Sequence, residues 1–217
     1  CKKCISICNF SAITWSDNRP KFDKFLCEGC GACQLVCPND AIKLERVKNG
    51  KIGVARTDYN FLLVTGKLEI GESGSGDIVV ETKKTAEKLA KNKEIMLVDS
   101  AGGIGCPVIA SISGSDYVVG VTEPTPSALN DLKRILKVAE HFKIPYGILI
   151  NKYDINEDLT NKIETFAKEH EISILGKIPY DESFVEALIK MKPLIVLKGE
   201  YMKFFRRLWD KIRINIS

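Results

Sequence analysis

The sequence predicts an α/β protein with a mostly parallel sheet, together with a small, cysteine-rich α+β segment at its beginning. Two observations carry this prediction. Short apolar runs alternate with amphipathic helical segments along most of the 217 residues, and seven of the eight cysteines lie at or before position 37. The composition changes near position 46, so we expect a small domain over residues 1–46 and a larger α/β domain over residues 47–217.

The cysteine-rich segment contains a run whose spacing is typical of a 4Fe-4S site. Its members are Cys27, Cys30, Cys33 and Cys37. Two, two and three residues separate them and Pro38 follows, which is the spacing of the bacterial cluster-binding run. Gly29 and Gly31 allow the backbone to fold tightly around a cluster. A zinc knuckle, which normally separates its cysteine pairs by a longer loop, and a disulfide framework are the alternatives.

The same pattern occurs a second time, incompletely, at the start of the chain. Residues 1–13 match residues 30–42, and the position equivalent to Cys27 would fall before Cys1. The chain also has no initiator Met, so we expect its natural N-terminus to be missing. In two-cluster ferredoxins the fourth cysteine of each run binds the other cluster. We therefore expect one complete ligand set, Cys8, Cys27, Cys30 and Cys33, and a second set that is one ligand short, Cys1, Cys4 and Cys37.

Composition excludes several functional classes. No apolar run approaches the roughly 18 residues of a membrane span, and no signal peptide is visible. Cysteines placed for metal indicate a reducing compartment, so we expect a cytoplasmic protein. The formal charge of +4 counts thiols as neutral, whereas each oxidised cubane with its four thiolates carries about −2. The net charge therefore gives no reason to expect nucleic acid or a membrane as partner.

Local patterns predict the secondary structure in chain order. Short strands are expected at residues 13–15 and 41–44, after each cysteine run, and the Asn49-Gly50 dipeptide predicts a hairpin turn. Four apolar runs are typical of buried parallel strands: 95–98, 117–121, 146–150 and 172–175. Amphipathic helices are expected between them. One covers residues 127–141 behind Thr125 and Pro126, and the other has an apolar stripe from Leu159 to Ala167.

Ligands of parallel α/β sheets bind where the strands end. Asp99 follows the first of these runs, as a Walker B acid would, and a glycine-rich loop over residues 100–105 comes next; an Asp at a strand end is also a common turn residue. Asn151-Lys152-Tyr153-Asp154 follows a later run, and an Asn here can bind adenine, although the same motif also occurs where guanine is bound. Pro179 provides a rigid turn after the last run.

A P-loop is not found in the sequence. The nearest approach to Gly-x-x-x-x-Gly-Lys-Ser/Thr is residues 71–78, where Asp77 stands in place of the lysine. A carboxylate there would repel phosphate, so we expect a mobile loop instead of a Walker A motif.

Taken together, these stretches resemble the MinD/ParA-type P-loop ATPases that carry an inserted ferredoxin domain, relatives of the Mrp-like iron-sulfur proteins. The resemblance is carried by the two cysteine runs and by residues 66–72, 98–108, 121–127 and 151–154. It implies a MinD-like sheet of P-loop NTPase type, with ATP and Mg²⁺ as cofactors. It also implies that Asp99 is the catalytic Walker B acid, that Gly105 lies in the γ-phosphate-sensing loop, and that Asn151, Pro179 and Asp181 lie around adenine.

The resemblance implies an ATPase that couples its nucleotide to a cluster. Such coupling would gate electron transfer to a redox partner or deliver a cluster or metal to a receiving protein, with an ATP-dependent homodimer as a further expectation. ATP hydrolysis is expected of the intact protein, because the family's Walker A loop precedes the insert. The alternatives are a ferredoxin-type electron-transfer module on a non-catalytic α/β scaffold and a cluster carrier that binds ATP structurally.

Three remaining features are interpreted as structural. Cys106 is expected to pack as a small buried residue before Pro107. His141 and His170 are expected near helix C-termini. The basic, amphipathic tail over residues 201–212 is expected to form a final helix that packs on the sheet and not a membrane-binding segment.

Overall fold

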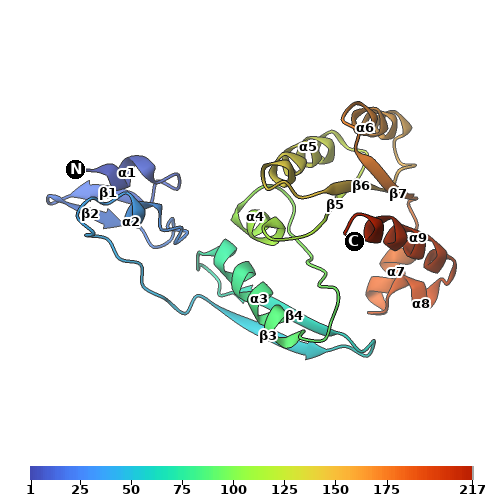
Figure 1. Ribbon diagram of the computed structural model, residues 1–217, viewed down its shortest axis with the longest axis horizontal. Coiled ribbons are helices and arrows are strands. Elements are labelled where there is room, and N and C mark those ends of the chain that lie inside the picture. Colours follow the sequence, from blue (N-terminus) through green and yellow to red (C-terminus); the bar gives the residue numbers. More distant parts are fainter. Residues whose placement is uncertain (217) are drawn as a thin grey trace. The chain divides into compact units, whose positions relative to one another are not determined.

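The computed structural model describes residues 1–216, which form two compact units (Figure 1). The first unit comprises residues 1–101 and 105–111, and the second comprises residues 102–104 and the chain from residue 112 onward. The domain boundary predicted near residue 46 falls inside the first unit and stays a prediction. No helix among the described residues is long and apolar enough to cross a membrane.

The cysteine-rich segment folds around a very small core. Its elements are α1 (Lys3–Ile7), β1 (Ile13–Ser16), β2 (Arg19–Phe22) and α2 (Ala32–Leu35). Strands β1 and β2 are antiparallel, and both residues of the turn between them, Asp17 and Asn18, have positive φ, as a type I′ turn requires. Cys4, Ile13 and Ile42 are buried together. Residues 41–44 do not form the predicted strand, although Ile42 still fills the core from an extended segment.

The rest of the first unit is a hairpin covered by a helix. Strand β3 (Gly50–Arg56) pairs with β4 (Leu62–Leu68), and helices α3 (Ser75–Leu89) and α4 (Cys106–Ile112) follow. The hairpin turn predicted at Asn49-Gly50 is wrong, because Gly50 already pairs with Leu68 and the chain reverses at residues 57–61. The Asn49 side chain instead donates to the Ser73 carbonyl oxygen, 2.7 Å away.

The second unit contains the predicted parallel sheet. Its strands are β5 (Val118–Thr122), β6 (Tyr146–Asn151) and β7 (Ser173–Ile178), in that spatial order. Helices α5 (Pro126–His141) and α6 (Glu157–Glu169) connect them, which confirms the α/β class. The Thr125 hydroxyl accepts from the Ala128 amide as the predicted cap of α5. One core cluster consists of Leu132, Leu136, Ile148, Ile150, Ile163 and Ala167.

A second apolar cluster joins the sheet to the C-terminal helices α7 (Ser183–Ile189), α8 (Leu194–Leu197) and α9 (Glu200–Ile214), drawn in orange to red in Figure 1. Its buried members are Leu149, Ile178, Ala187, Leu194 and Tyr201. Helix α9 packs so closely on β7 that a Cβ added at Gly176 would lie 2.9 Å from the Phe204 ring. The expectation that the basic tail packs on the sheet is confirmed.

Residues 95–98 do not form the predicted strand. The segment is extended, shows no ladder pairing among the described residues, and leaves Leu97 94% exposed. An apolar run becomes a strand only where a neighbouring strand supplies hydrogen-bond partners. The sequence pattern indicates an apolar run at residues 95–98 but does not show whether another strand lies beside it.

Gly147, in the central strand β6, has no space for a larger side chain. A Cβ at Gly147 would lie 2.6 Å from the Tyr117 hydroxyl oxygen and 2.8 Å from Leu175 Cγ. We expect Gly147→Ala to lower the free energy of unfolding by roughly 1–3 kcal/mol, as other overpacked cores do. Denaturant unfolding would measure this. Gly199→Ala is the matched control, because an added Cβ there meets nothing within 4 Å; equal stabilities of the two variants would contradict the packing argument.

Candidate functional site

Four cysteines line one pocket in the first unit. They are Cys8, Cys27, Cys30 and Cys33, which is the complete ligand set expected from the sequence. The pocket encloses about 360 Å³, open solvent included, and its walls also include apolar side chains such as Phe22 and Leu44. The structure thus brings together thiols that lie up to 25 positions apart in the chain. Their role as ligands stays a prediction.

The remaining three cysteines are arranged differently. Cys4 is buried in the small core, against which Cys37 packs as Cys8 and Cys33 do, whereas Cys1 is exposed. None of them lines the pocket. The second ligand set predicted from the sequence was expected to bind a separate cluster, and it stays a prediction.

The backbone of the cysteine run is shaped by two left-handed glycines. Gly29 has φ of +67° and Gly31 has φ of +77°, and Gly31 is the residue that begins the turn into α2. A side chain is strained in this conformation, so these glycines let the chain curve around the pocket. A Cβ at Gly31 would also approach Leu44 to 3.3 Å.

Backbone hydrogen bonds and burial shift the pKa values of two of the thiols. The Ala41 amide donates to Cys37 Sγ over 3.3 Å, and this hydrogen bond is the main reason that the pKa of the Cys37 thiol is lowered. Burial raises the pKa of Cys33 against weaker contributions from backbone hydrogen bonds. Amides directed at sulfur favour thiolate, the form that binds iron.

The thiols of the pocket are available to bind iron. All eight cysteines are free, so no disulfide framework forms. Among the described residues no three Cys, His, Asp or Glu side chains converge closely enough to hold a single metal ion. Zinc would draw its four ligands to within about 2.3 Å of one centre, whereas a cubane takes one thiolate at each of four separate iron atoms. The pocket supplies four thiols, the number that a 4Fe-4S cluster takes.

A second group of predicted residues lies at the carboxyl end of the parallel sheet. Asn151 ends β6 and pairs in register with Ile178, and Pro179 follows directly, so Asn151 and Pro179 lie at neighbouring strand ends. The Tyr153 amide donates to the Ile178 carbonyl oxygen, and the Asp154 carboxylate accepts from the Tyr180 amide over 2.7 Å. These bonds hold the Asn-Lys-x-Asp turn against the proline turn.

Residues around this edge add polar groups to which the sequence analysis assigned no individual role. Lys152, at φ of +51°, pairs with Glu123 over 3.1 Å and so connects the turn after β6 to the end of β5. Thr122 is 4% exposed, and its hydroxyl has no hydrogen-bond partner among the described residues. A buried unsatisfied hydroxyl costs free energy. Thr122 lies in the stretch 121–127 that carries the family resemblance, but no local pattern distinguishes it from the buried strand that it ends.

Asp181 is tied to the C-terminal helices. Its carboxylate accepts from the Ser183 amide and hydroxyl, from the Tyr201 hydroxyl at 2.8 Å, and from Lys198 Nζ at 3.0 Å. The Ser183 hydrogen bonds, followed by those from Lys198 and Tyr201, hold the pKa of Asp181 far below its usual range. Burial, together with the nearby carboxylate, raises the pKa of Tyr201 to about 12. The predicted place of Asp181 beside adenine stays a prediction, and its observed contacts are structural.

Asp99 and Gly105 lie in the first unit, whereas Asn151, Pro179 and Asp181 lie in the second. Asp99 is exposed after the extended segment. The Gly105 carbonyl accepts from the Val108 and Ile109 amides and so begins α4. The proposed phosphate roles of Asp99 and Gly105 stay predictions.

Comparison with known proteins finds a family match and several relatives. Residues 20–43 match the family model described as a 4Fe-4S binding domain. Among relatives from Methanocaldococcus jannaschii, Uncharacterized protein MJ0579 is 38% identical over 85% of this chain and 62% of its own length. Uncharacterized protein MJ0578 is 31% identical over 98% of this chain and 71% of its own length. A protein named iron-sulfur cluster carrier protein is 28% identical over 55% of this chain and 47% of its own length.

The fold has a solved counterpart. The cell division ATPase MinD of Pyrococcus furiosus superposes with a TM-score of 0.51 at 20% identity, over 64% of this chain and 58% of that protein. The chain belongs to one family with MJ0578, contains a 4Fe-4S binding domain and has a MinD-like fold. The resemblance inferred from the sequence motifs is thereby confirmed. This MinD-type chain spans between three fifths and three quarters of the length of MJ0579 and MJ0578, at 62% and 71%.

The pocket predicts which cysteines of the MinD-type chain control cluster content. After anaerobic reconstitution we expect about four irons per chain, because one ligand set is complete. Cys33→Ala should lose that iron, since Cys33 lines the pocket, whereas Cys1→Ala, which changes an exposed cysteine outside it, should keep the iron. Iron analysis with electron paramagnetic resonance would show this. Zinc uptake without iron, or equal loss in both variants, would contradict the ligand set.

The contacts of Asp181 predict a pH-dependent contribution to stability. Its folded pKa lies below the ordinary carboxyl value of 3.8, so the stabilisation is fully present above that pH and disappears as the pH falls through the folded pKa. Asp181→Asn should therefore unfold more easily than the parent at neutral pH, and the difference should shrink below about pH 4. Denaturant unfolding at several pH values measures it. Asp210→Asn, which changes an exposed carboxylate of α9, is the control; a pH-independent gap would contradict the ionic explanation.

Proposed function

We propose that the intact protein is a 4Fe-4S ATPase of the MinD type, in which ATP binding or hydrolysis is coupled to electron transfer or to delivery of a cluster or metal. The observation that carries this proposal is the pocket that gathers Cys8, Cys27, Cys30 and Cys33 in a chain whose fold is similar to that of MinD. Similarity in sequence to an iron-sulfur cluster carrier protein and in fold to the cell division ATPase MinD supports the two halves of the proposal.

The residues at the strand ends supply the nucleotide half of the proposal. Asn151 and Pro179, held side by side by the β6–β7 register, would contact the base of ATP. Asp99 would orient Mg²⁺ and water, and the Gly105 amide would contact the γ-phosphate. Asp181 would support this edge through its bonds to Ser183, Lys198 and Tyr201.

The partners follow from the same chemistry. We propose a redox protein or a cluster-receiving protein as partner, an ATP-dependent homodimer as the working assembly, and the cytoplasm as the location, because exposed thiols and clusters need a reducing compartment. A second candidate function is an electron-transfer module on a non-catalytic scaffold. It is favoured by one observation, the absence of a Gly-x-x-x-x-Gly-Lys-Ser/Thr stretch from these 217 residues.

Nucleotide variants distinguish the two candidates. In a version of the chain to which a Walker A segment has been joined before Cys1, Asp99→Asn should lower kcat about a hundredfold, equivalent to roughly 3 kcal/mol of transition-state stabilisation. Asn151→Ala should instead weaken ATP binding or the preference for ATP over GTP. Steady-state hydrolysis and calorimetry with Mg²⁺ measure both effects. Parent-like behaviour of both variants would favour the non-catalytic scaffold.

The chain of residues 1–217 alone provides a complementary test. We expect it to bind ATP weakly, because base contacts without a phosphate cradle do not offset the desolvation of the phosphates. Submicromolar binding in calorimetry would show that the phosphate site lies elsewhere in these residues.

A further inference from the structure

The loop between Cys27 and Cys30 is attached to the beginning of helix α3. One carboxylate oxygen of Glu28 accepts from the Gly74 amide at 3.2 Å, from the Ser75 amide at 3.3 Å and from the Ser75 hydroxyl at 3.4 Å. Glu28 is half-buried. A carboxylate that accepts from the free amides of a helix N-terminus is favoured both by the hydrogen bonds and by the helix dipole.

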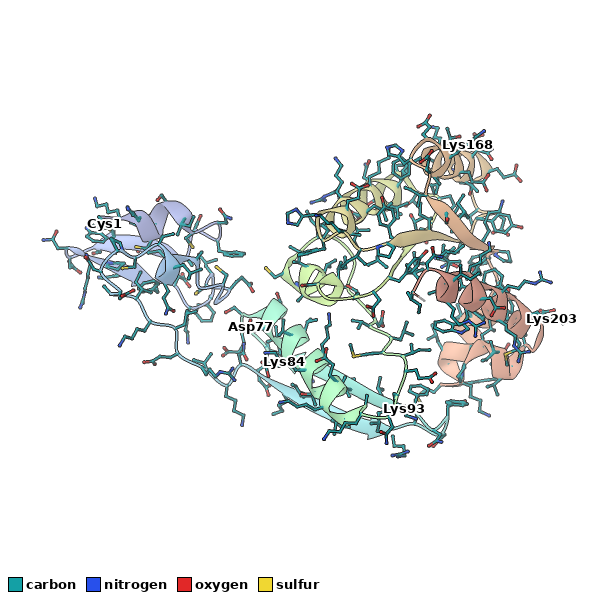
Figure 2. The ribbon with its side chains drawn as sticks, viewed as in Figure 1. Cys1, Asp77, Lys84, Lys93, Lys168 and Lys203 are labelled. Carbon is teal, nitrogen blue, oxygen red and sulfur yellow. The ribbon has the colours of Figure 1, made fainter. Side chains whose placement is uncertain are left out.

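Two further contacts fasten the same loop. The Ser73 hydroxyl donates to the Cys27 carbonyl oxygen over 2.6 Å. Gly29 lies beside Asp77, which is labelled in Figure 2 in the first turn of α3, and a Cβ at Gly29 would be 3.6 Å from the Asp77 carboxylate. Cys27 and Cys30 both line the cysteine pocket. The segment that carries two expected cluster ligands is thus held by residues more than 40 positions away in the sequence.

Helix α3 in turn contacts α4. A Cβ at Gly76 would lie 3.2 Å from Cys106 Cβ, so the first turns of the two helices touch. Farther along, Lys83 Nζ donates to the carbonyl oxygens of Ala110 at 3.2 Å and Ser111 at 2.9 Å. Helix α4 begins at the residue after Gly105, the last glycine of the loop over residues 100–105.

We propose that Glu28 is a positioning residue that links cluster occupancy to helix α3 and, through the contact between Gly76 and Cys106, to the start of α4. This inference rests on the proposed function in taking residues 100–105 as the loop that responds to the γ-phosphate. A bound cluster fixes Cys27, Cys30 and the carboxylate between them, and this stabilises the first turn of α3. By reciprocity, any displacement of α3 weakens retention of the cluster.

Hydrogen exchange of the chain with and without its reconstituted cluster tests the link. Cluster loading should slow exchange of the Gly74 and Ser75 amides and of the following turn about tenfold, with a smaller slowing at Val108 and Ile109. Glu28→Ala should remove this slowing while iron content stays at the parental level, and it should release iron to a chelator about tenfold faster. Glu28→Gln, which keeps an acceptor without the charge, should be intermediate.

Two further variants keep the test decisive. Glu45→Ala changes an exposed glutamate of the same segment that has no hydrogen bond or ion pair among the described residues, and it should behave like the parent. Ser73→Ala lies outside the cysteine run and breaks the bond to the Cys27 carbonyl, so it should reduce the slowing even if Glu28→Ala fails to load iron.

The outcomes separate this inference from the proposed function. The proposed link between Glu28 and helix α3 is overturned if iron-loaded Glu28→Ala shows the same slowing of amide exchange as the parent. If Glu28→Ala does not load iron, the same result in Ser73→Ala overturns it. A parent chain that takes up no iron refutes the cluster function instead. The contact between Glu28 and the start of α3 is then tested in the metal-free chain. Glu28→Ala should speed exchange of the Gly74 and Ser75 amides there, and unchanged exchange would overturn the contact.

Discussion

The convergence of four thiols on one pocket is the constraint on which the first part of the molecule depends. The buried core of the cysteine-rich segment is little more than Cys4, Ile13 and Ile42. Fewer than about 40–50 residues seldom bury enough apolar surface to fold without a disulfide, a metal or a partner, and all the cysteines here are free. Cluster binding would therefore supply folding free energy as well as chemistry. Any element attached to the cysteine loop then responds to the cluster.

The second unit is held together by buried apolar side chains, without the metal cluster expected in the first unit. Ile148 and Ile150 of the central strand are fully buried between α5 and α6 on one face. Leu149 of the same strand belongs to the cluster formed with the C-terminal helices. This packing fixes the register of β6 against β7, and the register places Asn151 beside Pro179. Packing of apolar side chains that themselves bind no ligand therefore determines where the candidate base-binding residues lie.

Sequence patterns predicted what is local and failed where a distant partner decides. Helix α5 was predictable because Thr125 and Pro126 mark its start within four residues of the Ala128 amide that the cap binds. The turn at Asn49-Gly50 failed, because Asn49 bonds to Ser73 and Gly50 pairs with Leu68.

In the candidate site, too, local features were predictable from the sequence and contacts between distant residues were not. The spacing of two residues between neighbours predicted that Cys27, Cys30 and Cys33 act together, whereas Cys8 was predicted from the exchange of ligands in two-cluster ferredoxins. Neither the contact between Glu28 and Ser75 nor the bonds from Lys198 and Tyr201 to Asp181 leaves a local pattern. Such contacts join positions from 17 to 47 residues apart, and a single sequence records no sign of which distant residues meet.

The central claim is that Cys8, Cys27, Cys30 and Cys33 hold one 4Fe-4S cluster. Mössbauer spectroscopy of the anaerobically reconstituted chain tests it most directly, because the spectrum separates a cubane from a single iron bound by four thiolates and from smaller clusters. The account predicts the spectrum of a diamagnetic, oxidised cubane that accounts for nearly all of the bound iron. A spectrum dominated by mononuclear ferric iron would contradict it.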